Sequence, residues 1–313
     1  THTFKPDLPP PSTSVGAVAW LRSNLFSNGF NILLTLLAAY LVWLIVPPVL
    51  NWALLDANWS GSTRADCSGE GACWVFVRER FGQFMYGFFP EGLRWRVNLT
   101  VLLAVAGAAP LFIQRMPRKA VYAAGFLLLY PLLAFWLLHG GFFALEEVPT
   151  SRWGGLMLTL VIAAVGIAGA LPLGILLALG RRSDLPAIRV LCVTFIEFWR
   201  GVPLMTVLFM SSVMLPLFLP EGLSFDKLVR ALIGVILFQS AYIAEVVRGG
   251  LQAIPKGQYE AAAAMGLGYW RMMGLVILPQ ALKLVIPGIV NTFIALFKDT
   301  SLVIIIGLFD LLN

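Results

Sequence analysis

Long apolar segments alternate with short polar loops along this chain, a pattern that predicts helices crossing a membrane. The apolar runs cover about residues 30–50, 97–113, 120–138, 154–179, 190–219, 228–247 and 273–297. A helix needs about 20 mostly apolar residues, with a range of about 17–25, to span the hydrocarbon core of a bilayer. We therefore expect an all-α polytopic membrane protein with seven spans.

The charges of the loops predict which side each loop faces. Basic residues collect in the turn at 115–119 and in the segment 180–189, whereas Glu146 and Glu147 lie between these two. Because Lys and Arg are enriched in cytoplasmic loops, the N-terminus, both basic segments and the loop after 228–247 are expected inside. The loop 51–96 carries five Arg and five acidic residues on the expected outer side, where long loops follow the charge rule poorly.

The outer loop also contains two of the three cysteines, Cys67 and Cys73. A Gly-containing turn separates them, so they can close a small disulfide ring if the loop faces an oxidising compartment. A pair of free thiols is the alternative. No metal site is predicted, because His2 and His139 lie far from the cysteines in sequence. Cys192 sits in an apolar run and is expected to pack there.

Composition supports a membrane protein and argues against a nucleic-acid-binding one. Hydrophobic residues make up 59% of the chain and charged residues 12%, and the mean hydropathy is +0.85. The net charge is +6, but the basic residues lie in short loops between apolar runs, as in cytoplasmic anchoring. The Pro- and Ser-rich tail at 1–14 is expected to be disordered.

A polar, helix-forming stretch interrupts the apolar pattern near residue 260. Pro255 and Gly257 precede a predicted short helix that runs from Gln258 through Glu260 and four alanines. Gly266 and Gly268 follow it. A narrow helix of small residues with one projecting carboxylate could fit into a groove of a partner. The alternative interpretation is an ordinary cytoplasmic loop helix.

The order of residues here resembles the signature EAA loop of ABC-importer permeases. Glu260-Ala261-Ala262, then Gly266, then Ile277-Leu278-Pro279 follow that signature, and its last element, Ile-x-Leu-Pro, is matched loosely. The blocks at 197–204, 242–258 and 279–302 are similar to the polar amino-acid branch of the family. The long N-terminal part most resembles the larger permease of proteobacterial general L-amino-acid import systems. Val207 departs from many relatives, which have Gln there.

The resemblance implies a non-catalytic membrane subunit in the bacterial inner membrane. Its implied partners are a dimer of ABC ATPase subunits, a second homologous permease subunit, a periplasmic substrate-binding protein, membrane lipid and a polar or acidic L-amino acid. ATP and Mg²⁺ would be bound by the ATPase, since the chain has no Gly-x4-Gly-Lys-Ser/Thr loop. The residues that would couple the chain to the ATPase are Glu260, Ala261, Ala262, Gly266, Ile277 and Pro279.

Three parts are predicted along the chain. Residues 1–29 form a cytoplasmic tail, 30–153 form a three-span extension with the periplasmic loop 51–96, and 154–313 form the permease core with a cytoplasmic coupling loop at 249–272. In this family the core has five spans. Only four are predicted here, which suggests a truncated version of a longer protein.

Polar side chains within spans are candidates for a substrate path because burying them in lipid is costly. The candidates are Gln239, Tyr242, Asn291, Lys298 and Asp299. Lys298 and Asp299 could match the carboxylate and ammonium of an amino acid, or they could have an internal structural role. Glu245 and Arg248 could simply pair, being three residues apart. The prolines at 172, 203, 279 and 287 favour kinks or breaks, which could act as gates or be static.

Two other classes of protein fit less well. An ion-coupled secondary amino-acid transporter would show an inverted internal repeat and buried carboxylates near mid-span, whereas no repeat is evident. An integral-membrane enzyme would need a catalytic cluster, and neither a His/Asp/Glu cluster nor a nucleophile motif is present.

Overall fold

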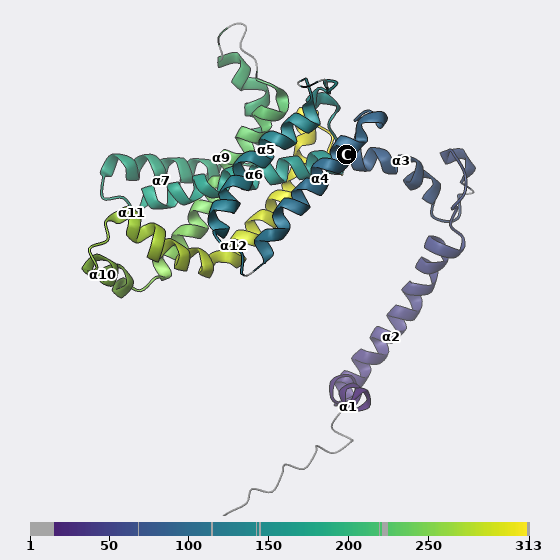
Figure 1. Cartoon of the computed structure of the whole chain (residues 1–313). Helices are drawn as coiled ribbons and strands as arrows, with labels where there is room; N and C mark the ends of the chain where they lie inside the picture. Colours follow the sequence, from purple (N-terminus) through teal and green to yellow (C-terminus); the bar gives the residue numbers. More distant parts are fainter. Residues whose placement is uncertain are drawn as a thin grey trace, which may run out of the picture. The chain divides into compact units, whose positions relative to one another are not determined.

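The computed structural model describes residues 16–67, 69–113, 115–141, 143, 145–218, 220 and 225–311. Their regular structure is helical, and the only β-pairing among them consists of isolated bridges. Six of the described helices are long and apolar enough to cross a membrane, and a bent pair of helices makes a possible seventh span. This confirms the expected all-α polytopic membrane protein (Figure 1). The predicted disordered tail at 1–14 lies outside the described residues.

The chain divides into two compact units, Thr1–Phe81 and Gly82–Asn313. The first contains α1 (Ala17–Asn24), α2 (Gly29–Leu50) and the beginning of α3 (Trp74–Tyr86). The side chain of Asn28 caps α2 by accepting the backbone N–H of Asn31 at 2.8 Å. The side chains of α2 are hydrophobic on all faces of the helix, and none of its residues is buried within the chain, as expected for a helix in lipid.

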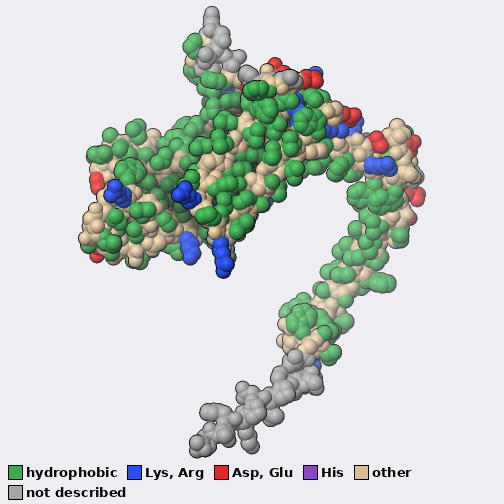
Figure 2. Space-filling model, viewed as in Figure 1, with side chains coloured by type: hydrophobic (Ala, Val, Ile, Leu, Met, Phe, Trp, Pro, Cys, Tyr) green, Lys and Arg blue, Asp and Glu red, His purple; other side chains and the backbone are tan. Residues whose placement is uncertain are grey.

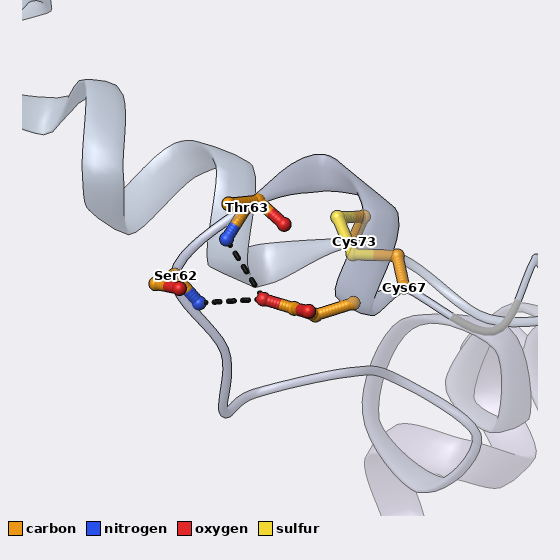
Figure 3. Close-up of a disulfide and its surroundings, with 5 residues drawn as sticks. Ser62, Thr63, Cys67 and Cys73 are labelled. Carbon is orange, nitrogen blue, oxygen red and sulfur yellow. Dashed lines mark hydrogen bonds between the residues drawn. A yellow bond between two sulfur atoms is a disulfide. The ribbon is translucent and has the colours of Figure 1, made fainter.

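The segment between α2 and α3 is ordered by short-range contacts. The backbone N–H of Asn58 donates to the carbonyl oxygen of Ala72 at 2.9 Å, and the Trp59 and Trp74 rings stack with centroids 5.6 Å apart. The structure contains a disulfide between Cys67 and Cys73 (Figure 3). Together these contacts give the predicted outer loop a defined conformation beside α3.

The second unit contains the remaining helices. These are α4 (Arg94–Ala108), α5 (Lys119–His139), α6 (Gly155–Arg181), α7 (Pro186–Gly201), α8 (Leu204–Phe209), α9 (Lys227–Ala253), α10 (Lys256–Ala264), α11 (Tyr269–Met272) and α12 (Leu278–Asp299). The most extensive packing is between α6 and α9, and α7 and α12 pack against both (Figure 1). α4 and α5 form a hairpin.

Small residues allow α6 and α9 to approach closely. A Cβ atom placed on Gly174 would lie 2.6 Å from a side-chain carbon of Ile243 and 2.9 Å from the carbonyl oxygen of Ser240. Gly166 similarly faces Val235 and Leu296, where a Cβ would lie 3.1 Å from each side chain. Close backbone approach at glycine is a common way to gain helix packing in membranes, where no hydrophobic effect drives association.

The apolar run at 190–219 differs from the continuous span expected from hydropathy. Two segments, Pro186–Gly201 and Leu204–Phe218, meet there with a bend of 103°. Gly201 ends α7, and Pro203 lacks the backbone N–H needed to continue the helix. The kink predicted from this proline is therefore a sharp break in the structure.

The boundary between the two compact units lies within α3. Unit Gly82–Asn313 includes α4 and α5 as well as the predicted permease core. The fully buried Arg96 of α4 donates to the carbonyl oxygens of Leu137 and Glu146, so it fixes the end of α5 and the loop that leads to α6. The division into extension and core at residue 153 stays a prediction.

Candidate functional site

α10 is a short helix whose ends are set by Pro255 and Gly266. Pro255 is the residue before the helix, which starts at Lys256, two residues earlier than the sequence suggested. Gly266 has φ +73°, in the left-handed region, and its N–H donates to the carbonyl oxygen of Ala263 at 2.9 Å. A left-handed glycine is a frequent helix terminator because it has no Cβ to clash. Ala263 lies within the run of alanines that forms this helix.

α10 packs by one face and leaves the other open. Ala262 is buried, whereas Glu260, Ala261 and Gly266 are exposed. Of the two other predicted coupling residues, Ile277 is fully buried and Pro279 is exposed at the beginning of α12. The structure thus places the Glu260 carboxylate and its small neighbours where a partner can reach them.

Three polar contacts hold α10 to the ends of the long helices. The Tyr259 hydroxyl accepts from Arg182 and donates to the carbonyl oxygen of Leu251, both at 3.1 Å. The Arg182 guanidinium also lies over the Tyr259 ring, 5.6 Å from its centroid. Gln280 donates to Gln258 at 3.1 Å. α10 is therefore connected to α9 and α12 and to Arg182, which directly follows α6.

A cluster of charged residues joins α6, α7 and α9 close to α10. Glu245, whose side chain is 16% exposed, contacts Arg181 at 2.7 Å, Arg248 at 2.9 Å and Arg200 at 3.8 Å. Arg181 also contacts Glu197 of α7 at 2.9 Å. The pairing of Glu245 with Arg248 was expected from their spacing, but the contacts to Arg181 and Arg200 bring together residues far apart in sequence. No local sequence pattern reveals them.

Two candidate path residues of α9 take part in packing contacts. Gln239 is buried, and its side-chain amide donates to the carbonyl oxygen of Thr292 in α12 at 2.9 Å. Tyr242 is partly exposed, and the Arg200 guanidinium lies 5.7 Å from its ring centroid. Gln239 therefore ties α9 to α12, and Tyr242 borders the charged cluster.

The three candidate path residues of α12 lie elsewhere. Asn291 and Lys298 are exposed in the single chain, and Asp299 is partly buried at the last residue of the helix. Asn291 directly precedes Thr292, whose carbonyl oxygen binds Gln239. The structure thus brings Gln239 close to the Asn291 backbone, whereas Lys298 and Asp299 lie about two turns further along α12.

Exposed apolar side chains beside α10 were missed by the sequence reasoning. Met265 is 80% exposed, Trp270 71% and Tyr269 45%. They flank Gly266 and Gly268, in the connection between α10 and α12. The sequence could have revealed them, because a Met and two aromatic residues stand in a loop that the charge rule assigns to the cytoplasm.

Comparison with known proteins gives a consistent set of similarities. Residues 170–313 match the family described as binding-protein-dependent transport system inner membrane component. The inner membrane amino-acid ABC transporter permease protein YhdY of Escherichia coli K12 is 67% identical over 98% of this chain and 84% of its own length. The glutamate/glutamine/aspartate/asparagine transport system permease protein BztC of Rhodobacter capsulatus is 41% identical over 96% of this chain and 84% of its own length.

More distant similarities are limited to about half of the chain. The probable glutamine ABC transporter permease protein GlnP of Bacillus subtilis is 34% identical over 51% of this chain and 72% of its own length. A crystal structure of an amino acid ABC transporter with histidines is 32% identical, with a TM-score of 0.45, and the match covers 50% of this chain and 72% of that one.

Proposed function

This chain belongs to the family of inner-membrane permease subunits of amino-acid ABC transporters, and we propose that it couples to its ATPase through α10. The family implies an ATPase and a substrate-binding protein as partners. Within that assembly, our proposal assigns this chain the passage of an amino acid through the membrane and no hydrolysis of its own. ATP and Mg²⁺ would be bound by the ATPase subunits.

The observation that carries the proposal is the way in which α10 is attached. Glu260 and Ala261 are exposed, while Tyr259 and Gln258 on the same helix contact Arg182, Leu251 and Gln280. A partner that binds the exposed face of α10 therefore acts on α9, on α12 and on Arg182 at the end of α6 at the same time. Exposed Met265 and Trp270 beside this face supply the large apolar side chains that typically dominate protein–protein interfaces.

We extend the proposal to the arrangement of the assembly. A second, homologous permease pairs with this chain, two ATPase subunits bind from the cytoplasm, and the N-terminus lies in the cytoplasm. The basic loops at 115–119 and 180–189 and the outer position expected for the disulfide support this orientation.

The proposed substrates are polar and acidic L-amino acids and their amides. One relative, 41% identical, is named for the transport of glutamate, glutamine, aspartate and asparagine. Exposed Lys298 and Asn291 on α12 offer a cation and an amide to such molecules, and Asp299 offers a group for the ammonium.

The test of coupling is the charge reversal Glu260→Lys in the assembled importer, reconstituted with its binding protein. We expect at least about a tenfold loss of ATP-driven uptake, the size of a coupling free energy of ~1.4 kcal/mol, with normal membrane insertion. Lys283→Glu, an exposed charge reversal on α12, is the matched control. Normal uptake by the Glu260→Lys protein would show that α10 does not carry the coupling.

A further inference from the structure

The hairpin of α4 and α5 carries an open apolar groove. It has a volume of about 400 Å³, within the range of about 300–1,000 Å³ typical of small-molecule sites. Leu103 of α4 and Tyr122, Phe126, Leu129 and Leu133 of α5 line it.

An aromatic ladder gives the groove a fixed shape. The rings of Tyr122, Phe126 and Tyr130 stack in succession, with centroids 6.5 and 5.0 Å apart. The Tyr122 hydroxyl donates to the carbonyl oxygen of Gly107 at 2.8 Å, and that of Tyr130 donates to Thr100 at 3.0 Å. Because both hydroxyls are bound to the α4 backbone, the groove wall presents apolar ring surface.

Gly125 leaves part of this groove empty. It lines the groove, and a Cβ added to it would meet no atom within 4 Å. From Tyr122 to Leu133 the groove follows 12 residues of helix, a rise of about 16 Å, which is close to half of the ~30 Å hydrocarbon core. Its length therefore matches one leaflet of the membrane.

A strongly basic turn lies at one end of this groove, one turn of helix before Tyr122. Arg115, Arg118 and Lys119 fall within five residues, and the chain has no Asp or Glu between 97 and 145. Arg115 and Arg118 are exposed, and Figure 2 shows Lys and Arg side chains at this end of the unit.

The basic turn and α10 lie at the same end of this unit. α4 begins beside the start of α6, because Gly87 pairs with Trp153. The charge rule assigns the basic turn at the far end of α4 and the segment 180–189 at the end of α6, where Arg182 holds α10, to the same side of the membrane. In the orientation proposed above, this is the cytoplasmic leaflet.

We propose that this hairpin binds an anionic glycerophospholipid, with its phosphate at Arg115, Arg118 and Lys119 and one acyl chain in the groove. Basic pockets between membrane helices on the cytoplasmic side attract such headgroups, and the surrounding leaflet supplies the chain. The site assigns a role to the α4–α5 hairpin, which lies outside residues 170–313, the part matched by the family model. It rests on the orientation proposed above, but it does not depend on the coupling through α10 or on the substrate.

The test uses the full chain in nanodiscs that contain phosphatidylglycerol with a photo-activatable acyl chain, or phosphatidylcholine with the same chain. Mass spectrometry then locates and quantifies the labelled peptides. We expect phosphatidylglycerol to label the segment 122–133, and phosphatidylcholine to label it at least about tenfold less, since each basic residue adds to the attraction for an anionic lipid.

Two variants separate the headgroup from the chain. Arg115→Gln/Arg118→Asn/Lys119→Gln removes the charges, with Asn at position 118 because φ there is +51°, and we expect the labelling by phosphatidylglycerol to fall about tenfold. Gly125→Leu places a side chain in the empty part of the groove without a clash. Because the acyl chain would then be excluded, labelling of Leu129 and Leu133 should be abolished. Arg189→Gln/Lys256→Gln/Arg271→Gln removes three charges elsewhere and should label normally.

Three results would overturn the proposal. Equal labelling by the two lipids, or normal labelling of the triple variant at 115–119, would show that the headgroup is not recognised. Unchanged labelling of the Gly125→Leu protein would show that the chain lies elsewhere. A cross-link from the groove to a segment of another subunit, in place of lipid, would identify a protein as the occupant.

Discussion

Glu245 is the residue on which the charged cluster depends, since it contacts three arginines from three helices. Its side chain is only 16% exposed, so little water can replace a lost partner. Glu197 shares Arg181 with it but is 54% exposed. The two carboxylates have the same chemistry and differ in burial, and this makes them a matched pair.

We expect Glu245→Gln to lower the free energy of unfolding by about 2–3 kcal/mol, because it removes the largely buried carboxylate charge that Arg181, Arg200 and Arg248 share. Glu197→Gln should cost less than about 1 kcal/mol, as is usual for exposed ion pairs. Denaturant unfolding of both proteins in the same detergent measures the difference. Equal losses would contradict the central position of Glu245.

Asp66 predicts how the outer loop responds to acid. The backbone N–H groups of Ser62 and Thr63 each donate to the same carboxylate oxygen at 2.8 Å (Figure 3). These bonds lower the pKa of Asp66 below its ordinary value of 3.8. Its contribution to loop stability is therefore present above pH 3.8 and is lost as the pH falls through the lowered pKa.

We expect amide hydrogen exchange at Ser62 and Thr63, corrected for its intrinsic pH dependence, to stay slow at pH 4 and to accelerate below it. Asp66→Ala should exchange quickly throughout this range. Mass-spectrometric exchange measured between pH 3 and 6 tests this, and a transition above pH 4.5 would contradict the lowered pKa.

At the scale of helices, hydropathy locates the spans but not how they pack. Gly174 illustrates this, because only the structure shows that Ile243 and the Ser240 carbonyl lie against it. Gly249, in the interior of α9, has no atom within 4 Å of an added Cβ. Both glycines lie within long helices, but an added Cβ would clash at Gly174 and would meet open space at Gly249.

We expect Gly174→Ala to destabilise the protein by about 1–3 kcal/mol, since the Ser240 backbone cannot move aside easily. Gly249→Ala should stabilise it by roughly 0.5–1 kcal/mol through better helix propensity. Thermal unfolding in detergent gives the sign for each variant. Stabilisation by Gly174→Ala of the same size as by Gly249→Ala would mean that α6 and α9 are not in close contact at Gly174.

The sequence predicted the helical class, most spans and the C-terminal end of α10, because these follow from local apolar runs and from Gly; α10 itself starts two residues earlier than predicted. The sequence predicted a kink or break at Pro203 but not its angle of 103°, and it did not predict the contacts of Arg181 with Glu197 and Glu245. An apolar run does not show at what angle one helical segment follows the next. The charged contacts form only when three helices pack together. Buried Arg96 was likewise grouped with the other arginines of the outer loop.

For the whole molecule, the proposed orientation is tested by labelling from each side of the membrane. In a background with Cys192→Ala, the exposed substitution Arg115→Cys should react only with reagents that cross the inner membrane. Cys67 and Cys73 should react only after reduction, with a reagent that does not cross it. Labelling of intact spheroplasts, followed by mass spectrometry, measures both. The reverse pattern would invert the topology.

A long-range contact closes the second unit at the start of α6. The N–H of Gly155 donates to the carbonyl oxygen of Phe309 at 3.0 Å, and that of Leu311 donates to the Thr159 hydroxyl at 3.2 Å across 152 residues. At a synthesis rate of about 5–20 residues per second, about 8–30 s pass between the translation of these two segments. During that interval the start of α6 is present without this contact, so the second unit cannot complete its packing until the segment at 309–311 has been synthesised.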